Sequence, residues 1–432
     1  MGQQYIRILM TLQNLGKRRQ CRERHRFRLI GLALFTTLLV WVGQAGFGAR
    51  LGLAAMQPPT EIRGVWLTNV DSEVLFSTGA LDETLQHLAD SHFNTIYPAI
   101  WSWGYTLYPS AVGQKVIGYK QGLYPDLEDE GRDEALEAAQ GDRDMLLEMI
   151  ELARDRELSV IPWFEFGFMA PATSPLAERH PDWLTQKQGQ RPEARLYQEG
   201  RHTRVWLNPF HPEVQQFMLE LVAELMANYP VDGLQLDDHF SLPVTFGYDP
   251  YTMGLYQREH QGQLPPTNPY DAEWMRWRAD KLTQFLGQVF GVVKAHRPDS
   301  VLSVSPNPAH FAYNHFLQDW PRWRELGYVE ELMVQVYRDR LATFRRTLQE
   351  PEIQQSRAHI PTGIGILGGL KDRPVPISLI RQQVETARSM GFAGVSFFFY
   401  DTLWSPASGE VRGDRVAAIQ AQFAQRRDRA SL

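Results

Sequence analysis

The 432-residue sequence contains a single cysteine, Cys21, which excludes a disulfide-stapled scaffold and any metal centre built from cysteine ligands. It also lacks the HExxH, GxSxG and GxxxxGK[ST] motifs of zinc metallohydrolases, serine hydrolases and P-loop nucleotide-binding proteins. Charged residues make up 22% and hydrophobic residues 43% of the chain, which is typical of a packed protein and excludes a largely disordered one. The sequence therefore predicts a globular protein whose chemistry does not depend on cysteine.

Basic residues are concentrated at the N-terminus. Residues 1–28 contain eight Lys or Arg and one acidic residue, and the following segment, Leu29–Ala49, contains no charge. A basic segment followed by an apolar run and small residues is typical of an export signal, and this run is also long enough to span a bilayer. We expect residues 1–28 to be the basic n-region and residues 29–55 to be a signal peptide or a membrane anchor. Positive-inside bias then places the rest of the chain in the periplasm or outside the cell.

The chain after residue 28 is acidic, because it carries 36 of the 44 Lys and Arg but 49 of the 50 Asp and Glu, a net charge of −13. Nucleic-acid binding depends on clustered Lys and Arg that contact phosphates, so this balance argues against nucleic acid as a partner. Aromatic residues make up 12% of the sequence. Many of them pack in the core, but exposed aromatic faces also suit flat partners such as sugar rings.

From about residue 60 onward, short apolar segments typical of strands alternate with amphipathic segments typical of helices. The strand-like segments are 63–71, 93–101, 158–166, 231–239, 301–308, 331–339, 360–367 and 394–401. Eight such units predict an α/β fold, a (β/α)8 TIM barrel over residues 60–405, followed by a C-terminal helix or tail over residues 406–432. In this fold the loops after the strands form the functional C-terminal rim, and here several of them are long.

Two carboxyl groups are expected to lie together at this rim. Side chains alternate across a strand, so Leu234 and Leu236 face the helices while Asp237 faces the barrel interior. Glu165 ends the neighbouring strand, about 4.8 Å away, which brings the two carboxyls within the ~5–9.5 Å range used for glycoside hydrolysis. We predict Glu165 as general acid and Asp237 as nucleophile or base. Asp238 is a further catalytic candidate, because strand ends bend.

Other polar and aromatic residues near the strand ends are predicted to bind substrate. The polar side chains would orient water or bind sugar hydroxyls, and the aromatic ones would stack on sugar rings. These candidates are Trp101, Trp103, Trp163, Asn307, Gln335, Tyr337, Asp339, Tyr400, Asp401 and Trp404.

The body of the chain contains several longer motifs, each of which occurs once, namely RGVWLTNVDS, FNTIYPAIW, WFEFGF, HPDWL, LNPFHPEV, VDGLQLDDHF and GVSFFFYD. In this combination they resemble the glycosyl-hydrolase-like barrels related to glycoside hydrolase family ten, over roughly residues 60–405. That family includes bacterial envelope proteins that act on peptidoglycan glycan strands. The resemblance implies a TIM barrel, hydrolysis of O-glycosidic bonds and an envelope or extracellular location. Its functional positions match Glu165, Asp237, Asp238 and Asn208 in this sequence.

The sequence departs from that family at two points. Many members are lipoproteins, whereas here no cysteine follows the apolar segment, so any anchoring would differ. Some members have Asn near the position of Glu165, which weakens the assignment of that residue relative to the Asp pair.

Together these observations predict an exported glycoside hydrolase acting on a polysaccharide, by resemblance the glycan strands of peptidoglycan, with no cofactor and no metal ion. Asn208 and His239 join the residues predicted to bind substrate. Two alternatives stay open. One is a catalytically silent glycan-binding envelope protein on the same barrel, and the other is a metal-dependent hydrolase that uses Asp237, Asp238 and His239.

Overall fold

The computed structural model describes residues 60–122, 143–189, 191–200, 202–371 and 373–430. The segments predicted as n-region and as signal or anchor, residues 1–28 and 29–55, lie outside the described residues, and their assignment stays a prediction. No helix within the described ranges is long and apolar enough to cross a membrane.

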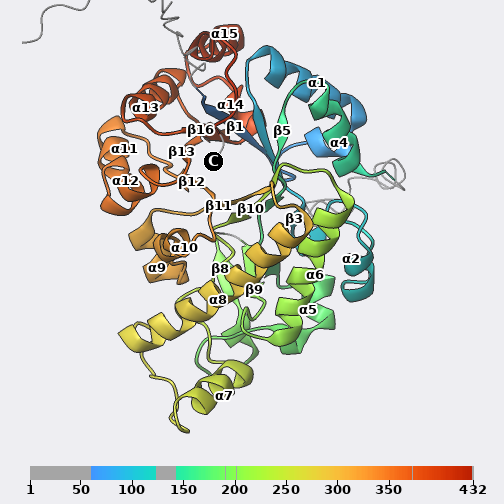
Figure 1. Ribbon diagram of the computed structural model, residues 1–432, viewed down its shortest axis with the longest axis vertical. Helices are drawn as coiled ribbons and strands as arrows, with labels where there is room; N and C mark the ends of the chain where they lie inside the picture. Colours follow the sequence, from blue (N-terminus) through green and yellow to red (C-terminus); the bar gives the residue numbers. More distant parts are fainter. Residues whose placement is uncertain (1–59, 123–142, 190, 201, 372, 431–432) are drawn as a thin grey trace, which may run out of the picture. The chain divides into compact units, whose positions relative to one another are not determined.

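A parallel sheet lies in the middle of the molecule with helices around it (Figure 1). Its strand order is β5-β2-β1-β16-β13-β12-β11-β10-β6. The strands are β1 (Ile62–Leu67), β2 (Thr95–Pro98), β5 (Ser159–Val160), β6 (Trp163–Phe164), β10 (Gly233–Asp237), β11 (Val301–Ser305), β12 (Glu331–Gln335), β13 (Thr362–Leu367) and β16 (Gly394–Phe398). The parallel sheet surrounded by helices that the sequence predicts is therefore confirmed.

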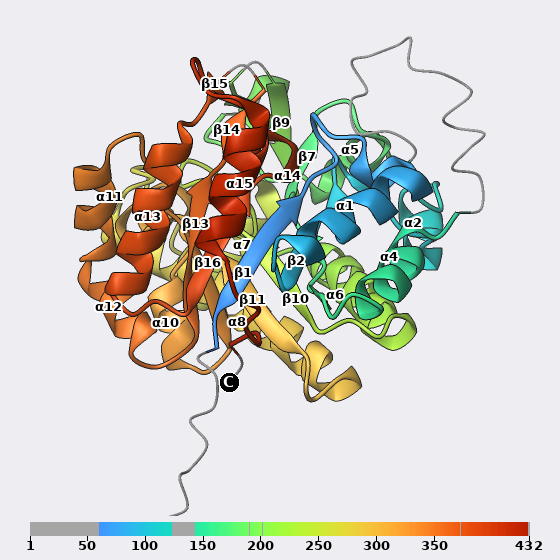
Figure 2. The same cartoon turned by 90° about the horizontal axis from the view of Figure 1, so that it is seen from above.

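The two strands at the ends of this order, β5 and β6, belong to one extended segment that is interrupted near Pro162. Proline has no backbone N–H to donate to a sheet ladder, which accounts for the break. The first half of the segment pairs with β2 and the second half pairs with β10. Strand pairing thus starts at the segment that holds β5 and β6, passes through all the other strand-like segments and returns to the same segment. Within this order, β1 lies beside β16 from the far end of the chain (Figure 2).

Except between β5 and β6, which lie in one extended segment, each connection between successive sheet strands carries at least one helix. The α-helices are α1 (Thr78–Asp90), α2 (Ala111–Val116), α4 (Met145–Arg154), α5 (Pro175–Arg179), α6 (Pro212–Asn228), α7 (Pro250–Glu259), α8 (Ala272–His296), α9 (Ala309–Phe316), α10 (Trp320–Glu325), α11 (Leu341–Leu348), α12 (Pro351–Arg357), α13 (Ile377–Ser389), α14 (Tyr400–Leu403) and α15 (Arg412–Gln422). Short 3-10 turns are η1 (Val74–Phe76), η2 (Pro181–Trp183) and η3 (Pro192–Arg195).

Helix α6 illustrates why these segments form helices against the sheet. Pro212 at the first helical position has a backbone angle that suits a helix start and lacks an N–H that would go unpaired there. Val214, Phe217, Leu221 and Leu225 recur at intervals of three or four residues and are all buried. This spacing forms one apolar stripe, which packs the helix into the core.

Smaller strands are inserted after the sheet strands. They are β3 (Trp101–Ser102), β4 (Tyr105–Thr106), β7 (Met169–Pro171), β8 (Tyr197–Glu199), β9 (His202–Trp206), β14 (Gly369–Leu370) and β15 (Arg373–Pro374). The connection from β6 to β10 is the most elaborate, because β7, β9 and β8 form a three-stranded antiparallel sheet within it. Long loops after strands are thus built into ordered structure that surrounds the strand ends.

The C-terminal residues pack against the opposite ends of the strands. Helix α15 contacts α13 (Figure 2), and the chain then returns to the start of β1, where the backbone N–H of Glu61 donates to Asp428 O at 2.9 Å. Asn94 adds a side-chain bond to Arg427 O at 3.1 Å. The described part of the segment predicted as a C-terminal helix or tail therefore packs against α13 and the start of β1.

Candidate active site

Glu165 and Asp237 lie at the carboxyl ends of two neighbouring strands. β6 ends one residue before Glu165, and β10 ends at Asp237. The parallel register pairs Leu236 with Phe164, which brings the next residue of each strand to the same level. On β10, Gln235 accepts a hydrogen bond from Trp66 Nε1 at 2.7 Å across the sheet interior. Asp237 has the same parity and faces the same way, in agreement with the alternation in the sequence.

Amide side chains from two other strands hold the Asp pair. Gln335 Nε2, at the end of β12, donates to Asp237 Oδ1 at 2.8 Å and to the backbone oxygen of Ser305 at 3.0 Å. Asn307 Nδ2 donates to Asp238 Oδ2 at 2.6 Å. Both amides are predicted site residues, and both contact a candidate catalytic carboxylate. The strand ends therefore fix the direction of the two Asp side chains before any substrate arrives.

His239 joins the two carboxylate-bearing loops. Its Nδ1 lies 2.9 Å from the backbone oxygen of Glu165, 3.5 Å from Asp238 Oδ1 and 3.7 Å from Asp237 Oδ2. The loops touch closely, since a Cβ atom added at Gly167 would lie 2.4 Å from the backbone of His239. Gly167 also has a φ of 47°, in the left-handed region that glycine tolerates best. A glycine is thus required for the loop after β6 to lie against the loop after β10.

The pKa values of the carboxyl groups shift with this burial. Burial is the largest cause that raises the pKa of Glu165 to about 7, and the positive charge of His239 and a hydrogen bond from Ser102 oppose it. Burial also raises the pKa of Asp237 well above its usual value, and the charges of Asp238 and Glu165 act in the same direction. Two adjacent carboxyls with raised pKa values are typical of acid–base sites.

Tyr337 lies close to all three carboxyl groups. Burial raises its pKa well above 10, and Asp237, Asp238 and Glu165 all contribute to that rise. The ring stacks on Phe398 with a centroid distance of 5.7 Å. The structure therefore brings Tyr337 together with Gln335, Asn307 and His239 around the carboxyls, as the sequence predicts for substrate-binding residues.

Trp163 and Trp103 are buried beside this site and have unbonded indole nitrogens. Trp163 packs against Trp66 and Phe398, each at a centroid distance of 6.3 Å. Trp103 packs against Phe166 at 5.6 Å. The two residues are 2% and 5% exposed, so they offer little open ring face to a sugar.

The remaining predicted residues are placed elsewhere by the local fold. Trp101 is fully buried and donates from Nε1 to Gly167 O, because it belongs to the β3–β4 hairpin. Asn208 is buried in a network with Asp249 and Thr252 at 2.9 Å each. Asp339 is exposed, four residues beyond the end of β12. None of these three contacts the carboxyl groups through a hydrogen bond or ion pair in the described structure.

Tyr400, Asp401 and Trp404 lie after β16, where the chain turns into α14 or just follows it. Tyr400 OH lies 3.3 Å from His87 Nδ1 on α1, and the ring of Trp404 lies 4.3 Å from the ring of His87. The pKa of Asp401 is raised by burial and by the acidic loop after β1. The helical turn directs these side chains toward α1 and that loop, so the strand alternation used in the prediction does not apply to them.

Four residues of the site were not predicted from the sequence. Ser102 donates to Glu165 Oε2 at 3.1 Å, and Gln318 Nε2 donates to Asp237 O at 3.0 Å. Glu199 Oε1 lies 3.3 Å from His239 Nε2, and Arg204 Nε donates to Glu199 Oε2 at 3.2 Å. Glu199 and Arg204 belong to the β8–β9 hairpin, whose two strands lie on either side of Gly200. This glycine is the local sign of the hairpin in the sequence.

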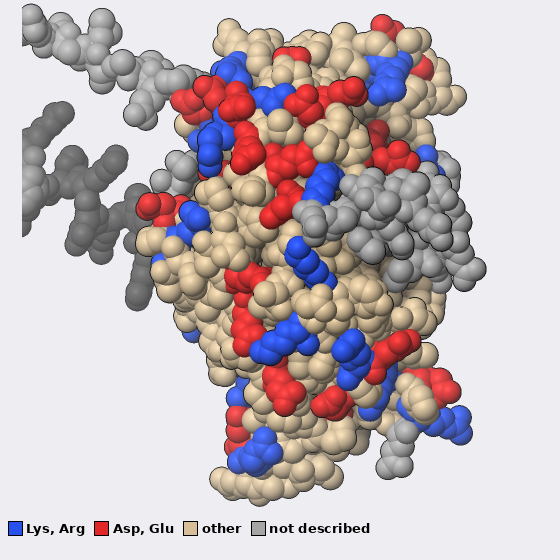
Figure 3. Space-filling view, turned by 90° about the vertical axis from the view of Figure 1, so that its right-hand side faces the viewer, with Lys and Arg blue, Asp and Glu red and all other residues tan. Residues whose placement is uncertain are grey.

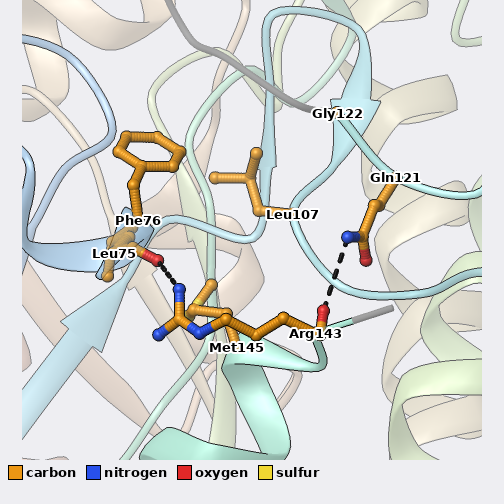
Figure 4. Close-up of a pocket in the computed structure, with 7 residues that line it drawn as sticks. All are labelled: Leu75, Phe76, Leu107, Gln121, Gly122, Arg143 and Met145. Atoms are coloured by element: carbon orange, nitrogen blue, oxygen red, sulfur yellow. Dashed lines mark hydrogen bonds between the residues drawn. The ribbon is translucent and has the colours of Figure 1, made fainter. Parts of the chain in front are cut away.

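The described cavities lie away from these residues. One cavity of about 20 Å³ is lined by Leu75, Phe76, Leu107, Gln121, Gly122, Arg143 and Met145. Figure 4 shows Arg143 bonded to the backbone of Leu75 and Gln121 bonded to the backbone of Arg143. This volume holds about one water molecule, not a sugar. A hollow of about 300 Å³ lies at the start of β5, at the opposite end of the strands from Asp237.

The surface of the protein carries charges of both signs. On the face drawn in Figure 3, Lys and Arg lie interspersed with Asp and Glu.

The sequence leaves open a metal-dependent hydrolase that uses Asp237, Asp238 and His239. These three residues each offer a ligand atom, and these atoms lie within 4.8 Å of one another. Both nitrogens of His239, however, face oxygen acceptors, which requires a proton on each. Such a ring has no lone pair for a metal, so its hydrogen bonds do not fit a metal ligand.

Buried carboxyl groups lie at the strand ends of this parallel sheet, and relatives of the chain are named as glycosyl hydrolases, so the class of the protein is a glycoside hydrolase, as the sequence predicts. The chain belongs to the family described as "Glycosyl hydrolase-like 10", which matches residues 61–387. This match confirms the family resemblance seen in the sequence motifs.

Known proteins agree with this membership. Glycosyl hydrolase DigH of Escherichia coli K12 is 25% identical, with 67% of this chain and 68% of that protein covered. Glycosyl hydrolase YngK of Bacillus subtilis is 24% identical, with 72% of this chain and 56% of that protein covered. The glycoside hydrolase domain of PgaB (BpsB) from Bordetella bronchiseptica has a similar fold, with a TM-score of 0.59 and 15% identity over 84% of this chain and 99% of that one.

Proposed function

We propose that this protein hydrolyses O-glycosidic bonds in the glycan strands of peptidoglycan, outside the cytoplasm, at the rim of a (β/α)8 barrel. The family membership supports hydrolysis of a polysaccharide. The resemblance to envelope proteins and the N-terminal basic and apolar segments support this substrate and location.

The observation that carries the proposal is the pair of buried carboxyl groups, Glu165 and Asp237, at the ends of the neighbouring strands β6 and β10, where burial raises the pKa of Glu165 to about 7. At neutral pH a large fraction of Glu165 is protonated, so it acts as the general acid that protonates the leaving sugar oxygen. Asp237 acts as nucleophile or base. An ionised Glu165 raises the pKa of Asp237, so the pair favours one shared proton, with one partner acidic and the other basic.

The surrounding residues then position the reactants. Gln335 holds one oxygen of Asp237, and Asn307 holds one oxygen of Asp238, so the other oxygen of each carboxylate receives no amide bond and lies within 4 Å of His239 Nδ1. Tyr337 adds a hydroxyl near the same three carboxyls. Fixed donors of this kind lower the cost of orienting substrate and water during reaction.

The test is cleavage of purified peptidoglycan glycan strands by the full-length chain, with and without EDTA, beside chitin and cellulose oligosaccharides. Glu165→Gln and Asp237→Asn should abolish cleavage but keep binding. The matched controls Glu193→Gln and Asp299→Asn lie at exposed positions and should keep both. Full activity in both site variants would overturn the assignment.

The same assay separates the alternatives. Binding of glycan strands without any cleavage would favour the catalytically silent protein. Loss of cleavage in EDTA, restored by a divalent metal, would favour the metal-dependent hydrolase. Cleavage of chitin or cellulose oligosaccharides in preference to peptidoglycan strands would keep the mechanism and reject the substrate.

A further inference from the structure

The β8–β9 hairpin brings an extra carboxylate and an extra cation to the candidate site. Glu199 ends β8 and Arg204 lies on β9, both within the connection between β6 and β10. The hairpin pairs Tyr197 with Arg204 and Glu199 with His202 in an antiparallel register. It therefore belongs to the loop that links the two strands carrying Glu165 and Asp237.

Arg204 is locked in place although it carries a charge. It is 4% exposed, and its guanidinium lies over the ring of Trp103 at 4.4 Å and over the ring of Phe166 at 5.2 Å. Its Nε donates to Glu199 Oε2 at 3.2 Å. The stacked arginine thus fixes one oxygen of Glu199 and leaves the other oxygen directed at His239.

The other side of His239 faces the reacting carboxyls. Nδ1 points at the backbone oxygen of Glu165, and the carboxylates of Asp237 and Asp238 lie within 4 Å of it. Since Nε2 faces Glu199, the ring has an oxygen acceptor at each nitrogen. An imidazole can satisfy both only as a cation, which donates from both nitrogens.

We propose that Glu199 is a positioning residue, which, held by Arg204, keeps His239 as a fixed imidazolium between Glu165 and the Asp237–Asp238 pair. The inference rests on the proposed function, in which Glu165 and Asp237 act on a glycan. The cation joins the two catalytic loops and partly offsets the repulsion among three carboxylates. Without it, Asp237 would hold its proton to higher pH and would be a poorer nucleophile or base near neutrality.

The carboxylates around His239 favour a fixed positive charge on its imidazole ring. Burial opposes it, but Asp238, then Glu199 and Asp237, raise the pKa of His239 to about 10. In turn, although burial acts against its charge, His239 and Arg204 lower the pKa of Glu199 to about 2.

The aromatic neighbours of His239 are not charged at neutral pH. The rings of Trp206 and Phe166 lie at centroid distances of 6.0 and 6.2 Å. Tyr197, on β8, has a pKa raised by burial and by Glu199 and Asp238, so its hydroxyl stays neutral.

The first test does not depend on activity. The full-length chain is labelled with 15N-histidine, and the imidazole nitrogens are followed by NMR from about pH 5 to 9, with His239→Gln used to assign the signal. In the wild type, His239 should stay doubly protonated through this range. In Glu199→Gln its pKa should fall by about 1–3 units, while Glu193→Gln should leave it unchanged. A neutral His239 in the wild type near pH 7 would overturn the proposal.

The second test is a double-mutant cycle on cleavage of peptidoglycan glycan strands. Glu199→Gln should lower kcat by about 10²-fold with little change in KM. His239→Gln should also shift the pH optimum upward, and Glu199→Gln should have no further effect in that background, because Glu199 acts through His239. Additive losses with an unchanged pH profile would mean that the hairpin is only structural, and would reject the proposal.

The two tests distinguish the two proposals. A wild-type chain that cleaves none of the glycans would reject the proposed function. The NMR titration would still decide whether Glu199 holds His239 as a cation.

Discussion

Two clusters of buried carboxylates lie at opposite ends of the same parallel strands, and they are paired with different partners. At the strand starts, Glu331 accepts hydrogen bonds from Tyr97 and from Arg429 of the C-terminal segment. Glu61 lies beside Arg63 at 2.8 Å and Arg388 at 2.5 Å. Each of these acids is therefore neutralised by at least one arginine.

At the strand ends, the acids receive neutral donors. Ser102 donates to Glu165, and Gln335 donates to Asp237. Among the described residues, no Lys or Arg forms an ion pair with either carboxyl group. Within the part of the chain that the structure describes, His239 lies within 4 Å of oxygen atoms on both loops and is shared among several acceptors.

We interpret this difference as a division of the sheet between a stabilising end and the end that we propose to be catalytic. A buried acid with an arginine partner stays ionised, and the intact pair contributes to the stability of the folded state. A buried acid without one holds a proton near neutral pH and is ready to donate it. The strand ends thus carry acids whose charged forms are costly to bury, which is a common property of active sites.

The largest predicted effect concerns turnover at the strand ends. Glu165→Gln and Asp237→Asn should each lower kcat on glycan strands by about 10²–10⁴-fold, because each removes a proton-transfer group. Thermal unfolding should show an unchanged or higher Tm, since a neutral amide replaces a buried acid that has no Lys or Arg partner among the described residues. A clear fall in Tm in both variants would place these residues with the stabilising acids instead.

The next effect concerns stability at the strand starts. Glu331→Gln should lower the free energy of unfolding by roughly 3–5 kcal/mol, because it leaves the largely buried Arg429 without its counter-charge. Chemical denaturation measures this loss, and turnover per folded molecule should stay near the wild-type value. The surface control Glu193→Gln should stay within about 0.5 kcal/mol. A stable but inactive Glu331→Gln variant would contradict the division between the two ends.

A smaller effect is expected at Asn208, which the sequence predicts in the site but the structure places in the framework. Its side chain donates to Asp249 and Thr252 and accepts from the backbone of Phe210. Asn208→Ala should therefore cost about 1–3 kcal/mol of unfolding free energy, the cost of unpaired buried groups. KM and kcat of the folded fraction should not change. A selective rise in KM with normal stability would return Asn208 to the binding site.

The sequence was sufficient to locate the strand segments but not to show where the strands end. Apolar periodicity located all eight segments. It did not show that Pro162 divides one of them or that β12 stops at Gln335. Periodicity reports burial along a segment, whereas a strand ends where its backbone loses ladder partners, which depends on residues distant in sequence.

The same limit explains which site residues were predicted. Asp237 and Gln335 lie within strands, where the alternation of side chains holds. Tyr400 follows β16 and begins a helical turn, so its direction is set by different geometry. Glu199 comes from an inserted hairpin, and its contact with His239 joins residues 40 positions apart. No local pattern encodes that contact, because it depends on how the insertion folds over the strand ends.

The smallest expected effect is also the sharpest test of the comparison. The contributions of Glu165 at the strand ends and Glu61 at the strand starts to folding stability should depend on pH in opposite ways. The pKa of Glu165 is raised from 4.5 to about 7, so its contribution to stability is full below about pH 4.5 and is lost as the pH rises to about 7. Burial acts to raise the pKa of Glu61, but Arg388 and Arg63 lower it below 4.5. Its contribution is therefore present above that pH and is lost as the pH falls through the lowered pKa.

Melting curves between about pH 2 and 8 test this contrast directly, because the contribution of Glu61 is lost below about pH 4.5. Relative to wild type, Glu165→Gln should become more stable as the pH rises, because the wild type must ionise a buried acid and the variant has nothing to ionise. Glu61→Gln should be most destabilised near neutral pH and less so in acid, where the wild type loses its ion pairs. Parallel pH profiles for the two variants would show that the acids at both ends are ionised alike, and the division between stabilising and reactive carboxylates would fail.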